Sequence, residues 1–100
     1  MSTLFVINRS WQQSAWLFEQ LAFARQGDSI LLIEDAVLAL QSPINLSSFT
    51  AKCAAMEIDV YGLYYDILLR GIDSKYSSIR QLGYSGYVDL VDKHDKQVAW

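Results

Sequence analysis

Short apolar runs recur along the chain and are separated by polar or glycine-containing segments. Several runs are apolar at every position rather than at every second one, which is typical of strands buried on both faces of a parallel sheet. The fourth run has the weakest pattern of the set. The predicted strands span residues 4–7, 30–33, 58–61, 78–82 and 97–100.

Helix-forming segments lie between these strands and carry recognisable end signals. Ser10 is a suitable N-cap for the first helix. Pro43 is expected to end the second, because proline restricts the residue before it and lacks a backbone donor. Gly71 is placed to end the fourth in the left-handed conformation. The predicted helices span residues 11–25, residues 35–40, a segment from Ser47 or Ser48 to residue 56, residues 63–70 and residues 86–94.

The alternation of strands and helices sets the expected fold class. Strands joined by helices form right-handed crossover units, which place helices on both faces of a parallel sheet. We therefore predict an α/β protein, a three-layer α/β/α sandwich with a mainly parallel five-stranded sheet. A chain of 100 residues has room for one core, so residues 1–100 are expected to form a single domain.

Composition narrows the possible partners. The chain is 52% hydrophobic and 19% charged, so a domain this small is expected to hide apolar surface against partner subunits. A well-filled monomer core is the alternative. The net charge is −3 and the basic residues form no dense patch, which argues against direct nucleic-acid binding. No apolar run reaches membrane-spanning length and no signal peptide is evident, so we expect a cytoplasmic protein.

Cys53 is the only thiol and His94 the only histidine. Helical spacing places Cys53 on one stripe with Phe49 and Met56, which favours a buried cysteine over an exposed sulfur carrier. His94 is expected to pack at the end of the last helix rather than to act in catalysis. Two such residues are a poor start for a metal site, so no metal or other cofactor is expected.

Polar residues follow the first two strands, where ligands of parallel sheets gather. Arg9, next to Asn8 and the start of a helix, could hold an anion, but the glycine-rich loop of a phosphate site is absent. Pairing of Arg9 with Glu34 or Asp35 is the favoured alternative. The two adjacent carboxylates could also support acid–base chemistry, although side chains of consecutive residues usually diverge, which favours charge pairing or capping.

Asp66 and Arg70 form a second polar pair after the third strand. Their i,i+4 spacing predicts an ion pair along one side of a helix. Such a pair is an ordinary helix-surface feature, so it does not by itself indicate a binding site.

The first predicted helix carries two aromatic residues away from its core face. Trp16 and Phe23 are seven residues apart and so lie on one line. The opposite face of this helix is apolar and consists of Leu17, Phe18, Leu21, Ala22 and Ala24. The aromatic pair is surrounded by the polar residues Gln12, Gln13, Glu19 and Gln20. This arrangement predicts a subunit interface at Trp16 and Phe23. The alternative is that Trp16 packs under a loop.

Several segments, taken in order, resemble the TusB/DsrH family. No single segment is specific, but their order, spacing and terminal tryptophan together are, and they cover essentially the whole chain. They are Ile7-Asn8-Arg9-Ser10, Asp28 followed by Leu31-Leu32-Ile33-Glu34-Asp35-Ala36-Val37, Tyr61-Gly62-Leu63 leading to Asp66 and Arg70-Gly71, and Gly86-Tyr87-Val88-Asp89-Leu90-Val91 before Trp100.

The resemblance implies a DsrE/DsrF/DsrH-like fold and a role in a sulfur relay. It implies a non-catalytic subunit that joins TusC- and TusD-like subunits in a heterohexamer. There a persulfide sulfur passes through TusD to TusE and on to the enzyme that thiolates wobble uridine in tRNA. Some DsrH proteins carry a cysteine in the first helix, and residues 11–25 have none. Two alternatives remain: a DsrH-like sulfur-carrier subunit of a sulfur-oxidation pathway that uses Cys53, and a small anion-binding module built on Arg9.

In the favoured hypothesis the strand-end residues face the reactive site of a sister subunit. They are Asn8, Arg9, Glu34, Asp35 and Asp66. Their expected function is to fix the shape of that neighbouring site through polar contacts.

Overall fold

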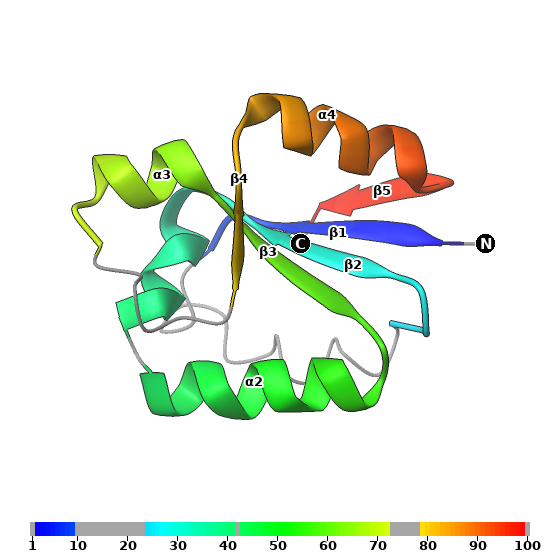
Figure 1. The fold of residues 1–100 in the computed structure, drawn as a ribbon, viewed down its shortest axis with the longest axis horizontal. Helices are drawn as coiled ribbons and strands as arrows, with labels where there is room; N and C mark the ends of the chain where they lie inside the picture. Colours follow the sequence, from blue (N-terminus) through cyan, green and yellow to red (C-terminus); the bar gives the residue numbers. More distant parts are fainter. Residues whose placement is uncertain (1, 10–23, 42, 73–78, 100) are drawn as a thin grey trace.

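The computed structural model describes residues 2–9, 24–41, 43–72 and 79–99, with the backbone alone over residues 43–47 (Figure 1). Strands and helices alternate along the described chain. In order they are β1 (Thr3–Ile7), β2 (Ser29–Leu32), the 3-10 helix η2 (Glu34–Gln41), α2 (Pro43–Ala55), β3 (Asp59–Leu63), α3 (Tyr64–Leu69), β4 (Arg80–Leu82), α4 (Tyr84–Lys93) and β5 (Lys96–Ala99).

The five described strands form one sheet in the order β4-β3-β2-β1-β5, and every neighbouring pair is parallel. Strand β1 lies between β2 and β5, and its Phe5 is opposite Ile30 of β2 on one side and Val98 of β5 on the other. The predicted α/β class and five-stranded sheet are therefore confirmed, and the sheet is parallel throughout the described residues.

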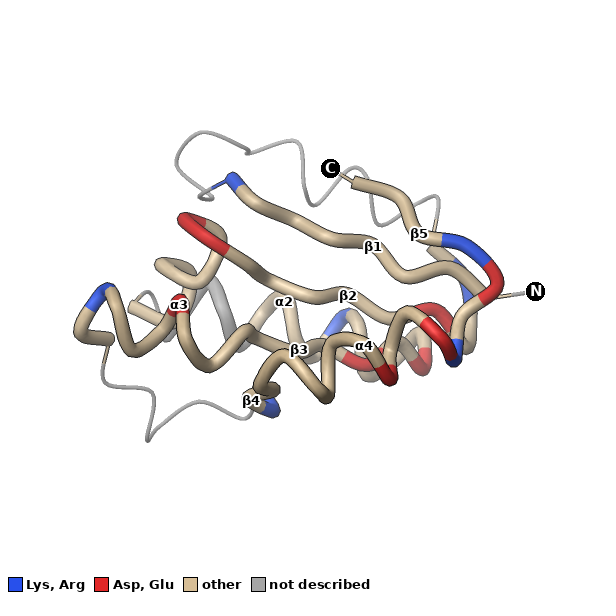
Figure 2. Tube along the Cα trace, turned by 90° about the horizontal axis from the view of Figure 1, so that it is seen from above, with Lys and Arg blue, Asp and Glu red and all other residues tan. Residues whose placement is uncertain are grey.

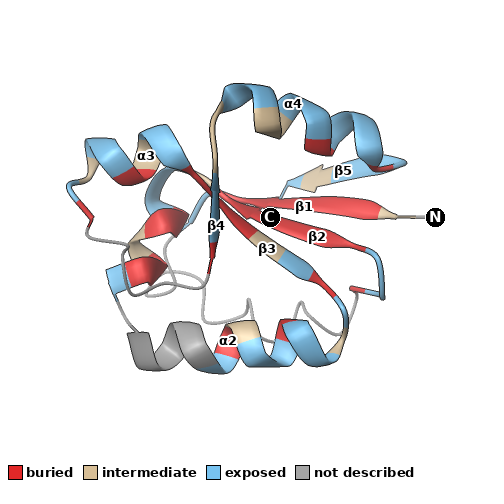
Figure 3. Cartoon of the chain, viewed as in Figure 1, coloured by how far each residue is buried: buried red, intermediate tan, exposed pale blue. Residues whose placement is uncertain are grey.

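Strands β1 and β2 bury both of their faces, as the continuous apolar runs predicted (Figure 3). Alternate residues point to opposite faces, so Phe5 and Leu4 belong to different cores. Phe5 packs in a cluster that includes Phe49 and Cys53 of α2, whereas Leu4 packs in a smaller cluster with Leu90 of α4. Helices α2 and α4 thus cover opposite faces of the sheet, which gives the three layers seen in Figure 1.

Several predicted boundaries were wrong by a few residues. Helix α2 begins at Pro43 rather than at Ser47 or Ser48, because proline suits the first turn of a helix, where its missing N–H needs no partner. Helix α4 begins at Tyr84, two residues before Gly86. Strand β3 runs on to Leu63, and β5 begins at Lys96. In the first predicted helix, residues 24 and 25 are not helical, and residues 11–23 lie outside the described residues.

Helix α3 ends as its glycine predicted. Gly71 has φ +62°, in the left-handed region that residues with a Cβ rarely adopt. Its N–H donates to the carbonyl of Leu68 at 3.1 Å, and the N–H of Ile72 donates to the carbonyl of Ile67 at 3.2 Å. These two bonds satisfy the last carbonyls of the helix.

Polar side chains are buried at the amino ends of the strands. Asp28 accepts the N–H of Thr3 at 2.9 Å. His94 is also buried, with Nδ1 2.8 Å from the carbonyl oxygen of Leu90 and Nε2 3.0 Å from Oγ of Ser29. His94 therefore joins the end of α4 to β2 and lies at the edge of the sheet opposite the strand carboxyl ends.

In the part of the chain that the structure describes, no helix has both the length and the apolar character needed to cross a membrane.

Candidate functional site

The carboxyl ends of the parallel strands meet at one edge of the sheet, and the predicted site residues within the described ranges gather there. Asn8 and Arg9 follow β1 and are exposed. Glu34 and Asp35 open the 3-10 helix after β2, and Asp66 lies in the first turn of α3 after β3. The topology therefore brings these acidic residues together from segments more than thirty residues apart.

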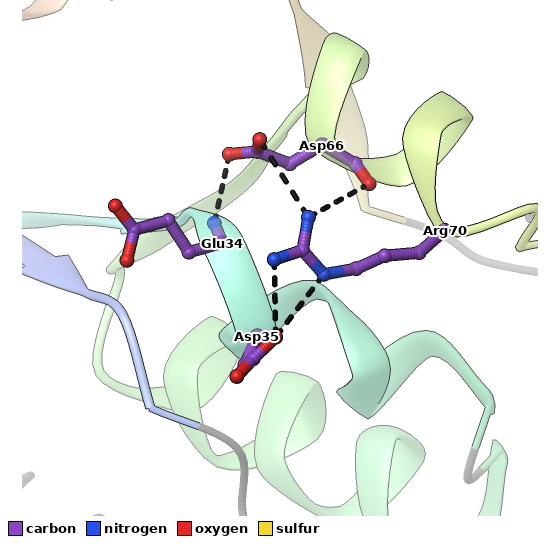
Figure 4. A network of polar contacts seen from close by, with 4 residues as sticks. All are labelled: Glu34, Asp35, Asp66 and Arg70. Carbon is purple, nitrogen blue, oxygen red and sulfur yellow. Dashed lines mark hydrogen bonds and ion pairs between the residues drawn. The ribbon is translucent and has the colours of Figure 1, made fainter.

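Glu34 and Asp66 are joined through backbone and side chain (Figure 4). Glu34 has φ +50°, in the left-handed region that a glutamate rarely adopts. Its backbone N–H donates to Oδ2 of Asp66 at 2.7 Å. A charged acceptor makes this a strong hydrogen bond, which holds the turn after β2 against α3.

Arg70 completes the cluster by contacting two carboxylates. Its Nη2 and Nε lie 3.0 and 3.3 Å from Oδ1 of Asp35. Its Nη1 lies 3.7 Å from Oδ1 of Asp66 and 3.5 Å from the carbonyl oxygen of Asp66 (Figure 4). The predicted pair of Asp66 and Arg70 is thus present, and Arg70 also reaches across to Asp35.

The partner of Asp35 differs from the one that the sequence suggested. We expected Arg9 to pair with Glu34 or Asp35, but among the described residues it forms no ion pair with either. Arg70 contacts Asp35 instead. This contact joins residues 35 positions apart in sequence, and no local spacing rule could have found it.

Together these residues form what we call the carboxyl-end cluster: Glu34, Asp35, Asp66 and Arg70. One guanidinium lies between two carboxylates, and the third acid contributes its backbone N–H. The side chain of Asp66 is 15% exposed and that of Arg70 is 27% exposed, so the pairing is partly shielded from water. Ion pairs of this kind fix the relative position of the segments they join, and none of these groups is a nucleophile of the type that carries sulfur.

Cys53 lies away from this cluster, inside the core on α2. Its side chain has no exposed surface. Burial raises the pKa of the thiol from 9.0 to about 11, against a smaller lowering effect of Lys52. The thiol is therefore protonated at neutral pH, and the predicted burial of Cys53 is confirmed.

Three exposed tyrosines were not singled out from the sequence, and two of them, Tyr64 and Tyr65, directly precede Asp66 of the carboxyl-end cluster. Tyr64 and Tyr65 open α3, and Tyr84 opens α4. The helical spacing of Tyr84, Val88 and Val91 was a signal that could have found part of this surface. The predicted interface residues Trp16 and Phe23 lie outside the described residues, so that interface stays a prediction.

Metal binding has no support in the described residues. No group of three or more histidine, cysteine, aspartate or glutamate side chains there is placed to hold an ion. The carboxyl-end cluster contains three acids, but Arg70 occupies the space between Asp35 and Asp66.

Comparison with known proteins is consistent with this architecture. The family described as DsrH like protein matches residues 9–97. Protein TusB of Photorhabdus laumondii is 35% identical over 99 residues, which cover 97% of this chain and 99% of the relative. Protein TusB of Escherichia coli O81 (strain ED1a) is 32% identical over 92 residues, covering 88% and 94%. The chain therefore belongs to the DsrH-like family, as the order of its segments had suggested.

Proposed function

We infer that the chain is a non-catalytic subunit of a sulfur-relay complex of the TusBCD type, which serves the 2-thiolation of wobble uridine in tRNA. Membership of the DsrH-like family and the similarity to proteins named TusB support the relay role. In this proposal the chain is cytoplasmic and assembles with TusC- and TusD-like subunits into a heterohexamer, a dimer of heterotrimers. The chain itself holds no persulfide and does not contact tRNA.

The observation that carries the proposal is the placement of the only thiol. A persulfide carrier needs a thiolate that its donor and acceptor can reach. Cys53 has no exposed surface, and its pKa is raised to about 11. The sulfur would then be carried by a cysteine of the TusD-like sister, which passes it to a TusE-like acceptor.

In this proposal the carboxyl-end cluster gives the chain its structural role, which is to position a sister subunit. Its ion pairs and hydrogen bond hold the ends of β2 and β3 and the start of α3 in one arrangement. A surface ordered in this way before assembly can position a neighbouring subunit at little entropic cost. In this proposal Asn8 and Arg9, exposed after β1, extend the same surface toward the sister subunit.

The test is to rebuild the complex with the TusC- and TusD-like subunits encoded in the same genome and to load it with an isotopically labelled sulfur donor. Mass spectrometry of each subunit then locates the persulfide. We expect the label on a sister subunit, and we expect a complex containing Cys53→Ala to pass sulfur to the TusE-like acceptor at the wild-type rate. A stable persulfide on Cys53, lost together with relay activity in Cys53→Ala, would instead establish the sulfur-carrier alternative.

A further inference from the structure

Helices α3 and α4 together expose an apolar surface to which the proposed function assigns no role. We call it the tyrosine surface, and its residues are between 37% and 59% exposed. Its members are Tyr64, Tyr65 and Leu68 of α3 and Tyr84, Val88 and Val91 of α4. Large apolar side chains gathered on one side of a soluble domain are typical of a protein contact.

The two helices contribute to one continuous surface because their tyrosines touch. The ring of Tyr65 stacks on that of Tyr84, with centroids 5.2 Å apart and planes 16° from parallel. Tyr64 meets Tyr65 edge to face, with centroids 5.5 Å apart. Rings held against one another have little conformational freedom left to lose on binding, which favours their use as contact anchors.

Helix α4 adds a charged border to this surface. Tyr84, Val88 and Val91 have the i, i+4, i+7 spacing of one helical stripe, while Leu90 points into the core. Asp89 and Asp92 are exposed on the outer side of α4, with Asp92 next to the stripe, and the exposed Lys93 ends the helix, so Figure 2 shows two acidic positions and one basic position there. The surface is therefore apolar at its centre, and its outer edge on α4 has two acidic residues against one basic residue.

We propose that the tyrosine surface is where this chain docks onto a sister subunit, through an apolar patch on the sister that is bordered by lysine or arginine. This inference rests on the proposed function. Basic residues on the sister would pair with Asp89 and Asp92 and would speed correct encounter. The acidic border disfavours RNA, whose phosphates would be repelled.

The same border disfavours a second copy of this chain as the occupant. In a two-fold symmetric contact each patch meets its own equivalent, so the stripe of α4 would lie against the same stripe. Such a contact would bring together four aspartates, Asp89 and Asp92 of each copy, with one exposed lysine per copy, Lys93, to offset them, and an excess of like charge in a contact is unfavourable. A sister with the opposite charge has no such conflict.

The position of the surface also explains how docking would affect the carboxyl-end cluster. Tyr64 and Tyr65 immediately precede Asp66, which accepts the N–H of Glu34 and pairs with Arg70. A sister bound on α3 would therefore lie beside this cluster. The docked sister would then contact both the tyrosine surface and the ordered ends of the strands.

The experiment measures the affinity of the purified chain for its TusC- and TusD-like sisters by biolayer interferometry. Val88→Asp and Tyr84→Ser change exposed side chains of the surface, and Ala55→Asp is the matched control on α2, across the sheet. We expect each surface variant to weaken binding by about tenfold or more, as for a central contact residue. The control should stay within about twofold, because a change outside a contact has little effect on affinity.

A charge reversal tests the border separately. Asp89→Lys with Asp92→Lys should weaken binding, and the effect should shrink as salt is raised, because salt screens exposed charges. Circular dichroism melts confirm that each variant is folded before its affinity is interpreted. If Val88→Asp unfolds the chain, the milder Tyr84→Ser decides the question.

The outcomes separate this inference from the proposed function. If the wild-type chain binds its sisters and the surface variants bind equally well, the docking site is wrong while the subunit role stands. If the wild-type chain binds neither sister, both fail. If the chain alone forms a dimer in analytical ultracentrifugation and Val88→Asp disperses it, a second copy is the occupant and the inference is overturned.

Discussion

Burial determines the chemistry of the chain's only thiol. Cys53 packs with Phe49 and the buried side chains of β1 and β2, where a thiolate would lose its hydration. Lys52 lowers the pKa of Cys53, but desolvation has the larger effect. The same feature that makes Cys53 a poor sulfur carrier makes its protonated form contribute to stability.

This contribution predicts a pH dependence. The pKa of Cys53 is about 11 in the folded chain against 9.0 as a reference, so the folded state holds the proton more tightly. The contribution of this proton binding to the free energy of unfolding is complete below pH 9 and falls as pH rises toward about 11. Its upper bound is about 1.4 kcal/mol for each pH unit that separates the two pKa values. The difference in unfolding free energy between wild type and Cys53→Ala should shrink over this range. A difference that is constant from pH 8 to pH 11 would contradict the burial of the thiol.

Asp66 offers a second prediction at the scale of one residue. Replacing it with alanine leaves the N–H of Glu34 without its acceptor and removes one carboxylate from Arg70. We expect Asp66→Ala to lower the unfolding free energy by about 1–3 kcal/mol, measured by urea denaturation. Asp66→Asn is the control, because it keeps an acceptor oxygen and loses only the charge. Its loss should stay within about 1 kcal/mol, and equal losses in the two variants would mean that the hydrogen bond contributes nothing.

At the scale of elements, helices α2 and α3 end in the same way with different residues. After α2, the N–H of Glu57 donates to the carbonyl of Ala54 at 3.0 Å and the N–H of Ile58 to that of Cys53 at 2.9 Å. Glu57 therefore occupies the position that Gly71 holds after α3, and its φ of +57° is close to the +62° of the glycine. A glutamate adopts this conformation at a cost that glycine avoids.

The comparison predicts opposite effects of opposite substitutions. Glu57→Gly should raise the unfolding free energy by about 1 kcal/mol, and Gly71→Ala should lower it by a similar amount. A Cβ at Gly71 meets no atom within 4 Å, so its cost would be conformational and not steric. Gly83→Ala is the control, because that residue is equally open but has φ −79°. Thermal melts of the three variants check the prediction, which fails if Gly83→Ala costs as much as Gly71→Ala.

The elements themselves were largely predictable, because their signals are local. Continuous apolar runs indicated parallel strands, and Gly71 marked the end of α3. The start of α2 was missed because Pro43 suits both the end of one helix and the first turn of the next, and which applies depends on how the chain packs.

The candidate site was predictable only in part. Parallel topology is enough to place Glu34, Asp35 and Asp66 at one edge, but the contact of Arg70 with Asp35 depends on how α3 packs beside the 3-10 helix. The tyrosine surface was missed for a related reason. Tyr64 and Tyr65 lie within the predicted helix 63–70, but which side of that helix stays exposed depends on how α3 packs in the fold.

At the scale of the whole molecule, the two faces of the sheet are unequally built. Among the residues that the structure describes, the face under α2 holds most of the buried apolar ones, including Phe49 and Cys53, neither of which has exposed surface. The other face holds a smaller cluster, to which α4 contributes Leu90 as its one buried residue. Of the two described helices that cover the sheet, α4 therefore contributes the fewer buried apolar residues.

This asymmetry predicts that α4 opens before the rest of the domain. Elements with few buried apolar contacts open at a lower free energy than the core strands, so amides of α4 should exchange with solvent faster than those of β1 and β2. Leu90→Ala should lower the opening free energy of α4 while leaving the exchange of Leu31 in β2 much less affected. Native-state hydrogen exchange of the free chain measures both.

Assembly should then reverse the difference if α4 carries the docking surface. A sister subunit that binds only the closed form stabilises that form by mass action, so exchange of α4 should slow far more than that of α2 when the TusC- and TusD-like subunits are added. Helix α2, on the opposite face of the sheet, is the internal reference (Figure 1). Equal opening free energies for α4 and β2 in the free chain would show that the domain opens only as a whole. The smaller cluster would then stabilise α4 as strongly as the larger cluster stabilises α2.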